Sequence, residues 1–231
     1  MKKRFLALLL AFGLLCPVRA EPAGAPVRGY VALTFDDGPS ELTAELSRQL
    51  RGRGVRATFF VCSYKVLESP QTLCRLAEDG HEIGLHSCSH EYMQHMEKGA
   101  ILEDMLESAQ LVTECCGAAP RLFRPPGGLY NDELLEAAGE LGLSVILWSV
   151  DPQDWKYQDA DRVFAAVCRD VFPGAVILLH DLYGTSVQAA LRLVDALQQE
   201  GYRFCTVSEL AEKTGEPLQP GRIYKCFAAP D

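Results

Sequence analysis

Several side chains that can bind a metal or transfer protons occur in short clusters along this chain. Asp36 and Asp37 are adjacent after an apolar run, and His86 and His90 are four residues apart. Two imidazoles on one helical turn would point at one place. With one carboxylate and a water they are the ligands of a catalytic zinc site. Because adjacent carboxylates at a buried strand end carry a desolvation cost, the pattern favours metal binding over the alternative of a solvated turn.

Five polar clusters each follow an expected strand. They begin at Asp36, His86, Arg124, Asp151 and His180. In parallel α/β folds, ligands bind at the carboxyl ends of the strands. We therefore expect the five clusters to meet on one rim of a parallel sheet.

The elements that must position these clusters alternate between strand and helix. Apolar runs at 28–35, 57–61, 82–85, 121–124, 144–150, 175–179 and 202–206 predict about seven strands, with helical periodicity between them. Continuously apolar strands indicate a parallel sheet covered by helices, and either a barrel or an open doubly wound sheet fits. We predict one α/β domain over residues 28–214, after a short linker at 21–27 and before a C-terminal tail at 215–231.

Residues 1–20 resemble a secretory signal peptide. A basic start precedes an apolar run that is too short for a confident membrane span. This predicts a secreted or cell-envelope protein with no stable membrane span after cleavage. Lipidation at Cys16 and an uncleaved anchor are the alternatives.

The charge of the chain restricts its partners. The whole sequence has a net charge of −9, and residues 1–20 contain four basic and no acidic residues, which leaves 18 basic against 31 acidic. This balance argues against nucleic acid and anionic membranes as partners, whereas it permits a neutral glycan. We expect a monomer.

Eight of the nine cysteines lie beyond residue 20. An even number in an exported chain predicts disulfides, although the sequence does not define the pairs.

The clusters also resemble the five motifs of the polysaccharide deacetylase family, the NodB homology domain of metal-dependent carbohydrate esterases. The matching stretches are Thr34-Phe35-Asp36-Asp37-Gly38-Pro39, His86-Ser87-x-x-His90, Arg124-x-Pro126-x-Gly128, Asp151-x-x-Asp154-Trp155 and Leu178-x-His180, in the family's order. The resemblance implies a distorted (β/α) barrel with about seven parallel strands. It also implies a zinc-dependent N-deacetylase for N-acetylglucosamine units of a glycan, with peptidoglycan as the leading substrate.

The resemblance also assigns the reacting groups. Asp37, His86 and His90 would hold a divalent metal, most simply Zn²⁺. Asp36 would be the general base for the attacking water, and His180 the general acid for the leaving amine. A base and an acid of opposite starting protonation are what amide hydrolysis requires.

Further residues would support them. Asp154 would hydrogen-bond His180 and favour its imidazolium, and Arg124 would pair with Asp36. Trp155 and Leu178 would line the acetyl pocket.

The chain departs from the family pattern at two positions. Gly127 stands where the family commonly has Tyr or Phe, whose backbone N–H helps to bind the oxyanion. The donor is retained, but a Gly-Gly loop is less preorganised, and we expect a more open cleft wall. Leu85 stands where the family often has Asn, which we interpret as altered packing.

Other polar residues have simpler interpretations. We interpret His81 as part of a helix end, His95 as a surface loop residue, and Asp151 and Asp181 as loop or supporting residues. Cys88 lies between the two histidines but is expected to face away from them. The alternative functions are an O-acetyl esterase on xylan-like chains and an inactive glycan-binding module.

Overall fold

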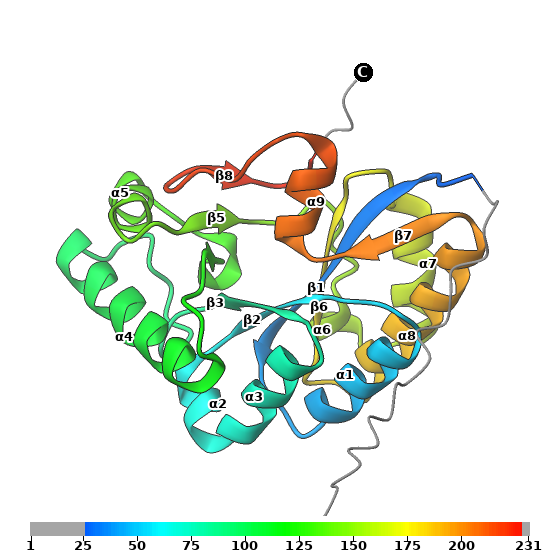
Figure 1. Ribbon diagram of the computed structural model, residues 1–231, viewed down its shortest axis with the longest axis horizontal. Helices are drawn as coiled ribbons and strands as arrows, with labels where there is room; N and C mark the ends of the chain where they lie inside the picture. The colour runs from blue at the N-terminus through cyan, green and yellow to red at the C-terminus, as the bar shows by residue number, and fades with distance from the viewer. Residues whose placement is uncertain (1–25, 228–231) are drawn as a thin grey trace, which may run out of the picture.

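The computed structural model describes residues 26–227, and within them eight strands form one parallel sheet. They are β1 Gly29–Gly38, β2 Thr58–Val61, β3 Glu82–Leu85, β4 Leu122–Phe123, β5 Ser144–Ile146, β6 Val176–His180, β7 Tyr202–Cys205 and β8 Ile223–Tyr224. The order is β6-β1-β2-β3-β4-β5-β8, and β7 pairs with the first part of β1. The curled sheet is the distorted (β/α) barrel that the sequence predicted (Figure 1).

The two ends of the sheet meet through isolated bridges. Val150 pairs with Ile177 in parallel, and Ala175 pairs with Cys226 in antiparallel. Because bridges replace a continuous ladder at this position, the barrel is distorted.

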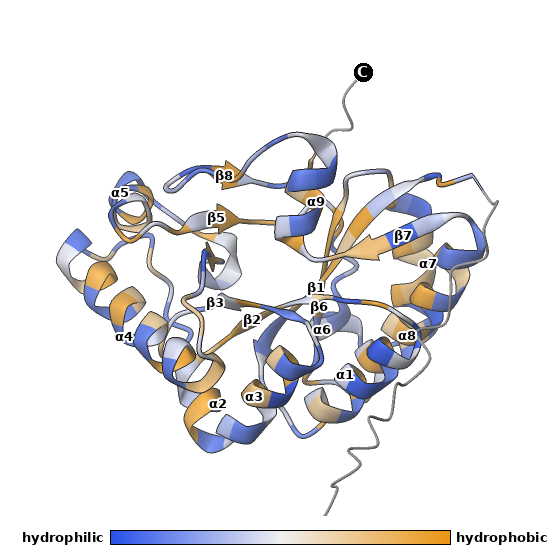
Figure 2. Ribbon diagram, in the orientation of Figure 1, coloured by the Kyte–Doolittle hydropathy of each residue, from blue (hydrophilic) through white to orange (hydrophobic). Residues whose placement is uncertain are grey.

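Nine α-helices lie within the described residues. They are α1 Thr43–Gly52, α2 Ser63–Glu68, α3 Pro70–Glu78, α4 Lys98–Cys116, α5 Asp132–Glu140, α6 Asp154–Tyr157, α7 Ala160–Asp170, α8 Gly184–Gln199 and α9 Val207–Thr214. Most of the longer helices cover the outside of the sheet, with polar residues turned away from the strands (Figures 1 and 2). No helix in this part of the chain combines the length and apolarity needed to cross a membrane.

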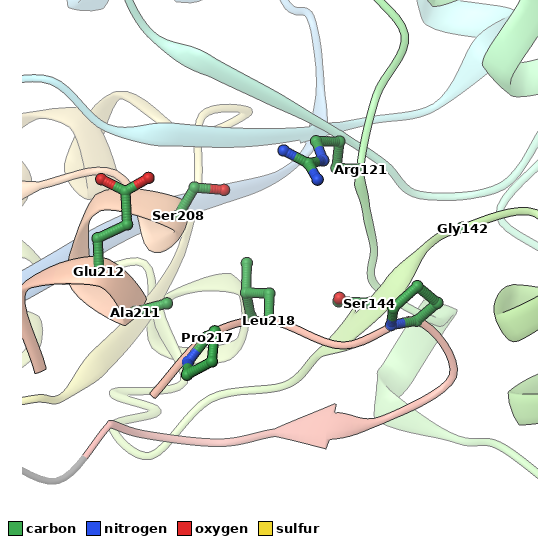
Figure 3. A pocket seen from close by; sticks show the side chains of 9 residues that line it. Arg121, Gly142, Ser144, Ser208, Ala211, Glu212, Pro217 and Leu218 are labelled. Atoms are coloured by element: carbon green, nitrogen blue, oxygen red, sulfur yellow. The ribbon is translucent and has the colours of Figure 1, made fainter. Parts of the chain in front are cut away.

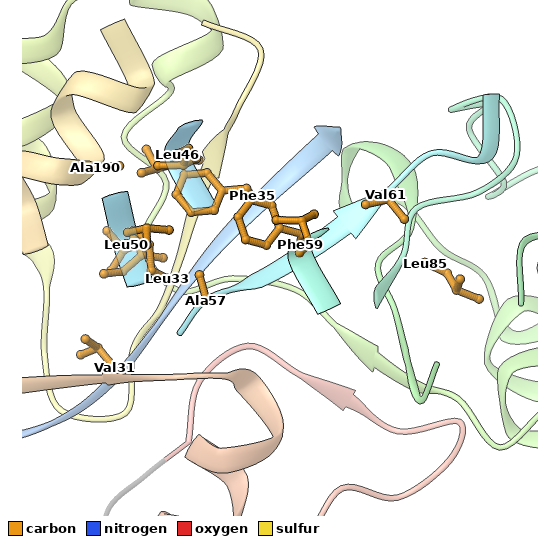
Figure 4. Packing of buried hydrophobic residues seen from close by; sticks show 14 of the residues in the cluster. Val31, Leu33, Phe35, Leu46, Leu50, Ala57, Phe59, Val61, Leu85 and Ala190 are labelled. Atoms are coloured by element: carbon orange, nitrogen blue, oxygen red, sulfur yellow. The ribbon is translucent and has the colours of Figure 1, made fainter. Parts of the chain in front are cut away.

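Alternating strand residues supply two apolar layers. Leu33 and Phe35 of β1 pack with Phe59 of β2 and with Leu46 of α1 in the outer layer (Figure 4). The rings of Phe35 and Phe59 stack with centroids 5.0 Å apart. The opposite face of the sheet forms a smaller inner cluster with α9. Its buried members are Ala32, Phe60, Leu122, Ile146, Val176, Cys205, Val207, Leu210, Ala211, Tyr224 and Phe227.

The C-terminal segment contributes to this architecture. The predicted tail contains β8, which pairs with β5, and Phe227 is fully buried in the inner cluster. The predicted signal peptide at 1–20, including Cys16, lies outside the described residues.

Candidate active site

Asp37, His86 and His90 come together at the carboxyl ends of β1 and β3. Oδ1 of Asp37 lies 3.2 Å from Nε2 of His86 and 3.2 Å from Nε2 of His90. One donor atom from each of the three residues lies within 4.8 Å of the other two. Burial alone would raise the pKa of Asp37, but its contacts with the two imidazoles outweigh burial and lower that pKa below its usual range.

This group fits a divalent metal ion. Oδ1 of Asp37 is buried and has no hydrogen-bond partner among the described residues, although two imidazole nitrogens face it. Nδ1 of His86 donates to the Arg124 carbonyl at 2.7 Å, so Nε2 is the ring nitrogen that faces Asp37. A carbonyl behind a histidine in this way fixes the tautomer that metal binding requires.

The two histidines converge through a loop, so the predicted helical turn is wrong. Residues 86–90 form no helix, and Ser87 and His90 have positive φ angles of 66° and 63°. The backbone N–H of His90 donates to Oγ of Ser87 at 2.8 Å, and Asp104 accepts from the N–H of Cys88 at 2.9 Å. These bonds stabilise a bend that places the ring centroids of His86 and His90 5.1 Å apart.

Asp36 points to the other side of β1 from the outer core. Its Oδ1 accepts from Nη1 of Arg124 at 2.7 Å, and its Oδ2 lies 3.8 Å from Nε2 of His86. The Arg124 side chain is fully buried, and it also donates to Oγ1 of Thr34 and to the carbonyls of Ile146 and Leu147. These four hydrogen bonds compensate the buried charge of Arg124 and fix the position of Asp36.

Thr34 is a member of this site that the sequence analysis did not assign. The sequence did offer a signal for it: Thr34 is two residues from Asp36 on β1, and residues two apart share one face of a strand.

His180 lies beside Asp36 at the end of the neighbouring strand, where the two are paired in the β1–β6 register. Its Nδ1 lies 2.9 Å from Oδ1 of the fully buried Asp154. Nε2 of His180 is 4.0 Å from Oδ2 of Asp37, so this nitrogen faces the candidate metal ligands. Asp36, the candidate proton acceptor, and His180, the candidate proton donor, therefore both lie next to the candidate metal ligands.

The remaining predicted residues border the same rim. Leu178 precedes His180 by two residues on β6 and is 3% exposed, whereas Trp155 on α6 is 49% exposed. Gly127 lies in a short 3₁₀ turn, Pro126–Gly128, that follows β4. A Cβ at Gly128 would lie 2.8 Å from the Trp148 ring, so this second glycine is needed for close packing.

The space beside Gly127 contains an aromatic ring, contrary to the open wall that the sequence predicted. A Cβ at Gly127 would lie 3.0 Å from Cε1 of Tyr92. Tyr92 comes from the loop after His90, which is distant in sequence from the glycine. Sequence spacing offered no signal for this contact.

The residues given simpler interpretations do not join the metal group. Nδ1 of His81 accepts from the N–H of Ala57 at 3.1 Å. Sγ of Cys88 lies 3.3 Å from Oγ of Ser108. Asp181 is fully buried and hydrogen-bonds the Thr43 hydroxyl. All eight described cysteines are free thiols, so the structure gives no support to the disulfide prediction.

A separate cavity of about 210 Å³ lies at the opposite ends of the strands (Figure 3). Arg121, Ser144, Ser208 and Leu218 are among its lining residues. Because Arg121 precedes β4 and Ser144 begins β5, this cavity lies at the amino ends of these strands, whereas the candidate metal group lies at the carboxyl ends of β1 and β3. It contains none of the predicted site residues.

The structure is thus a parallel (β/α) barrel with a candidate metal site of two histidines and an aspartate at its rim. The model of the polysaccharide deacetylase family matches residues 23–146. The chain belongs to this family.

Two relatives illustrate the similarity. The peptidoglycan-N-acetylglucosamine deacetylase PgdA of Listeria monocytogenes is 36% identical over 195 residues, covering 84% of this chain and 41% of that protein. A peptidoglycan-N-acetylglucosamine deacetylase of Bacillus cereus is 34% identical over 186 residues, covering 78% of this chain and 87% of that protein. The chain thus spans about two fifths of the Listeria protein and most of the Bacillus cereus one.

Solved structures show the same fold. A T48 deacetylase with substrate has a TM-score of 0.81 at 32% identity, covering 86% of this chain and 97% of that chain. A family 4 acetyl xylan esterase from Clostridium thermocellum, in complex with a cobalt ion, has a TM-score of 0.80 at 32% identity, covering 85% and 98%.

Proposed function

We propose that this protein is a secreted or cell-envelope, metal-dependent N-deacetylase that removes acetyl groups from N-acetylglucosamine units of a glycan, with peptidoglycan as the first candidate. The observation that carries the proposal is the convergence of Asp37, His86 and His90 within 4.8 Å, between a buried carboxylate and a histidine. Relatives named as peptidoglycan deacetylases support the choice of glycan.

Asp37, His86 and His90 would hold the metal, and Zn²⁺ suits two imidazoles and a carboxylate. When bound, such an ion polarises the substrate carbonyl and lowers the pKa of water. Side chains of the protein would carry out the proton transfers. Oδ2 of Asp36, which Arg124 does not engage, would accept the proton of the attacking water.

His180 would donate a proton to the leaving amine. Burial lowers the pKa of His180, but the hydrogen bond and charge of Asp154 outweigh burial and raise it to about 9. The imidazolium is therefore the main form at neutral pH, which is the form that a general acid requires. The N–H of Gly127 would support the developing oxyanion, and Leu178 and Trp155 would border the acetyl group.

Acetate release tests this proposal. The full chain with added Zn²⁺ should release acetate from N-acetylglucosamine oligosaccharides and from peptidoglycan, and a chelator should abolish the release. Absence of release with any divalent metal would contradict the proposal.

A second candidate is an O-acetyl esterase on xylan-like chains. The similarity to an acetyl xylan esterase favours it, and the same groups can attack an ester. Acetate release from acetylated xylan, but not from the N-acetylated oligosaccharides, would establish this alternative. An inactive glycan-binding module would bind the oligosaccharides without any release.

A further inference from the structure

An exposed aromatic ring lies next to the candidate metal group. Tyr92 follows His90 by two residues and is 59% exposed, and the centroids of the two rings are 6.2 Å apart. Large aromatic side chains bury much apolar area when a ligand covers them. The ring therefore presents an apolar face beside the place where the substrate's acetyl group must lie.

The backbone of a distant loop supports the ring. A Cβ at Gly127 would be 3.0 Å from Cε1, 3.6 Å from Cδ1 and 3.7 Å from Cζ of Tyr92, so the ring edge lies directly over this glycine. Gly127 has a φ of 64°, a conformation that glycine adopts without strain. The absence of a side chain there is what allows Tyr92 to approach.

The next residue holds Tyr92 outward. Met93 is fully buried in the outer core, and its carbonyl accepts the N–H of Met96 at 3.0 Å. Because Met93 is anchored, the Tyr92 side chain is directed to the surface before any ligand arrives. A preorganised ring loses little conformational entropy on binding.

We propose that Tyr92 is a carbohydrate-stacking platform, which binds a sugar unit adjacent to the unit that is deacetylated. This inference rests on the proposed function, because it assumes a chain of sugars across the rim. The apolar C–H face of a pyranose would cover the exposed face of the ring. The exposed Trp155 follows Asp154, on the part of the rim that holds His180, whereas Tyr92 lies beside His90. A glycan would thus have aromatic contacts on both sides of the metal group.

Steady-state kinetics on an N-acetylglucosamine oligosaccharide test the platform. Tyr92→Ala should raise KM roughly 5- to 30-fold, the factor that one or two kcal/mol produces, with little change in kcat. Tyr92→Phe retains the ring and should keep the original KM. Phe172→Ala removes another exposed ring, 39% exposed and located before β6, and serves as the matched control. An unchanged KM in Tyr92→Ala, or an equal rise in Phe172→Ala, would overturn the platform.

Direct binding separates this inference from the proposed function. Calorimetry with the same oligosaccharide and chelator-treated protein needs no turnover. Weaker binding by Tyr92→Ala but not by Tyr92→Phe supports the platform even if the wild-type protein releases no acetate. Equal binding by all three proteins contradicts the platform even if the wild-type protein is an active deacetylase.

Discussion

Asp154 binds His180 through both carboxylate oxygens. Oδ1 lies 2.9 Å from the ring Nδ1, and Oδ2 accepts the backbone N–H of the same histidine at 2.9 Å. One carboxylate therefore sets both the position and the ring orientation of His180. It also leaves Nε2 as the nitrogen that faces Asp37.

The first prediction concerns the pH dependence of activity. Burial lowers the pKa of His180, but Asp154 raises it to about 9, so a general acid at this position loses its proton only as pH rises through that value. Asp154→Asn removes the carboxylate charge, and burial then lowers the pKa. The alkaline limb of the kcat/KM profile should move to lower pH, with about a tenfold loss per pKa unit at fixed alkaline pH. An unmoved limb would show that another group provides the proton.

The second prediction concerns Asp36. Asp36→Asn should lower kcat by about 10²- to 10⁴-fold, because the amide cannot accept the proton of water. The zinc content of the purified variant should equal that of the wild type, since Asp36 is not among the three candidate ligands. The buried Arg124 loses its charged partner, so we expect a free energy of unfolding lower by roughly 3–5 kcal/mol.

Denaturant unfolding of the same preparation provides the control. Activity is compared only where the variant is fully folded. Retained turnover in that folded protein would remove Asp36 from the mechanism.

The sequence predicted the residues at the carboxyl ends of the strands better than the conformations of the loops that follow them. Apolar runs followed by polar clusters fix where strands end, and parallel strands bring their carboxyl ends to one edge. This logic placed Asp36, His86 and His180 correctly in space. Alternation along β1 also predicts that Asp36 and Asp37 point to different sides. The register of β1 shifts between Asp36 and Gly38, and Asp37 has a φ of 70°, so the alternation does not continue through this strand end. Both carboxylates therefore approach Nε2 of His86, at 3.8 Å from Asp36 and 3.2 Å from Asp37.

Local periodicity could not predict the loops. The bend at His86–His90 depends on bonds from Ser87 and Asp104, and the contact of Tyr92 with Gly127 joins two loops that are far apart in the sequence. α6 has four residues, which is too short for a helical period to be recognised. β8 has two, and it becomes a strand only because β5 offers a partner.

The third prediction concerns metal removal. A ligand that binds only the folded state stabilises it, by about 2.7 kcal/mol at a concentration 100 times Kd. Zn²⁺ should therefore raise the Tm of chelator-treated protein, and His90→Ala should reduce this rise. His95→Ala is a matched control, because His95 is an exposed histidine in the same loop. An equal rise in wild type and His90→Ala would contradict the assignment of the ligands.

The fourth prediction concerns Asp181, a fully buried carboxyl group behind the rim. Burial raises its pKa from 3.8 to about 7, while the hydrogen bond from Thr43 opposes the rise. Its Oδ1 has no hydrogen-bond donor among the described residues. Between these two pKa values the folded state keeps a proton that the unfolded state has lost. Stability therefore falls as pH rises through this window, by about 1.4 kcal/mol per pKa unit of difference.

Asp181→Asn removes this titration, so the stability of the variant relative to the wild type should increase as pH rises from about 4 to 7 and stay constant above that range. The comparison isolates Asp181, because His180 and Glu82 titrate in both proteins. Thr43→Val gives the opposite test. It removes the donor that stabilises the carboxylate, so it should raise the pKa of Asp181 further and extend the loss of stability to higher pH. Denaturant unfolding at several pH values measures both differences, and parallel stability curves for all three proteins would show that Asp181 does not titrate in this range.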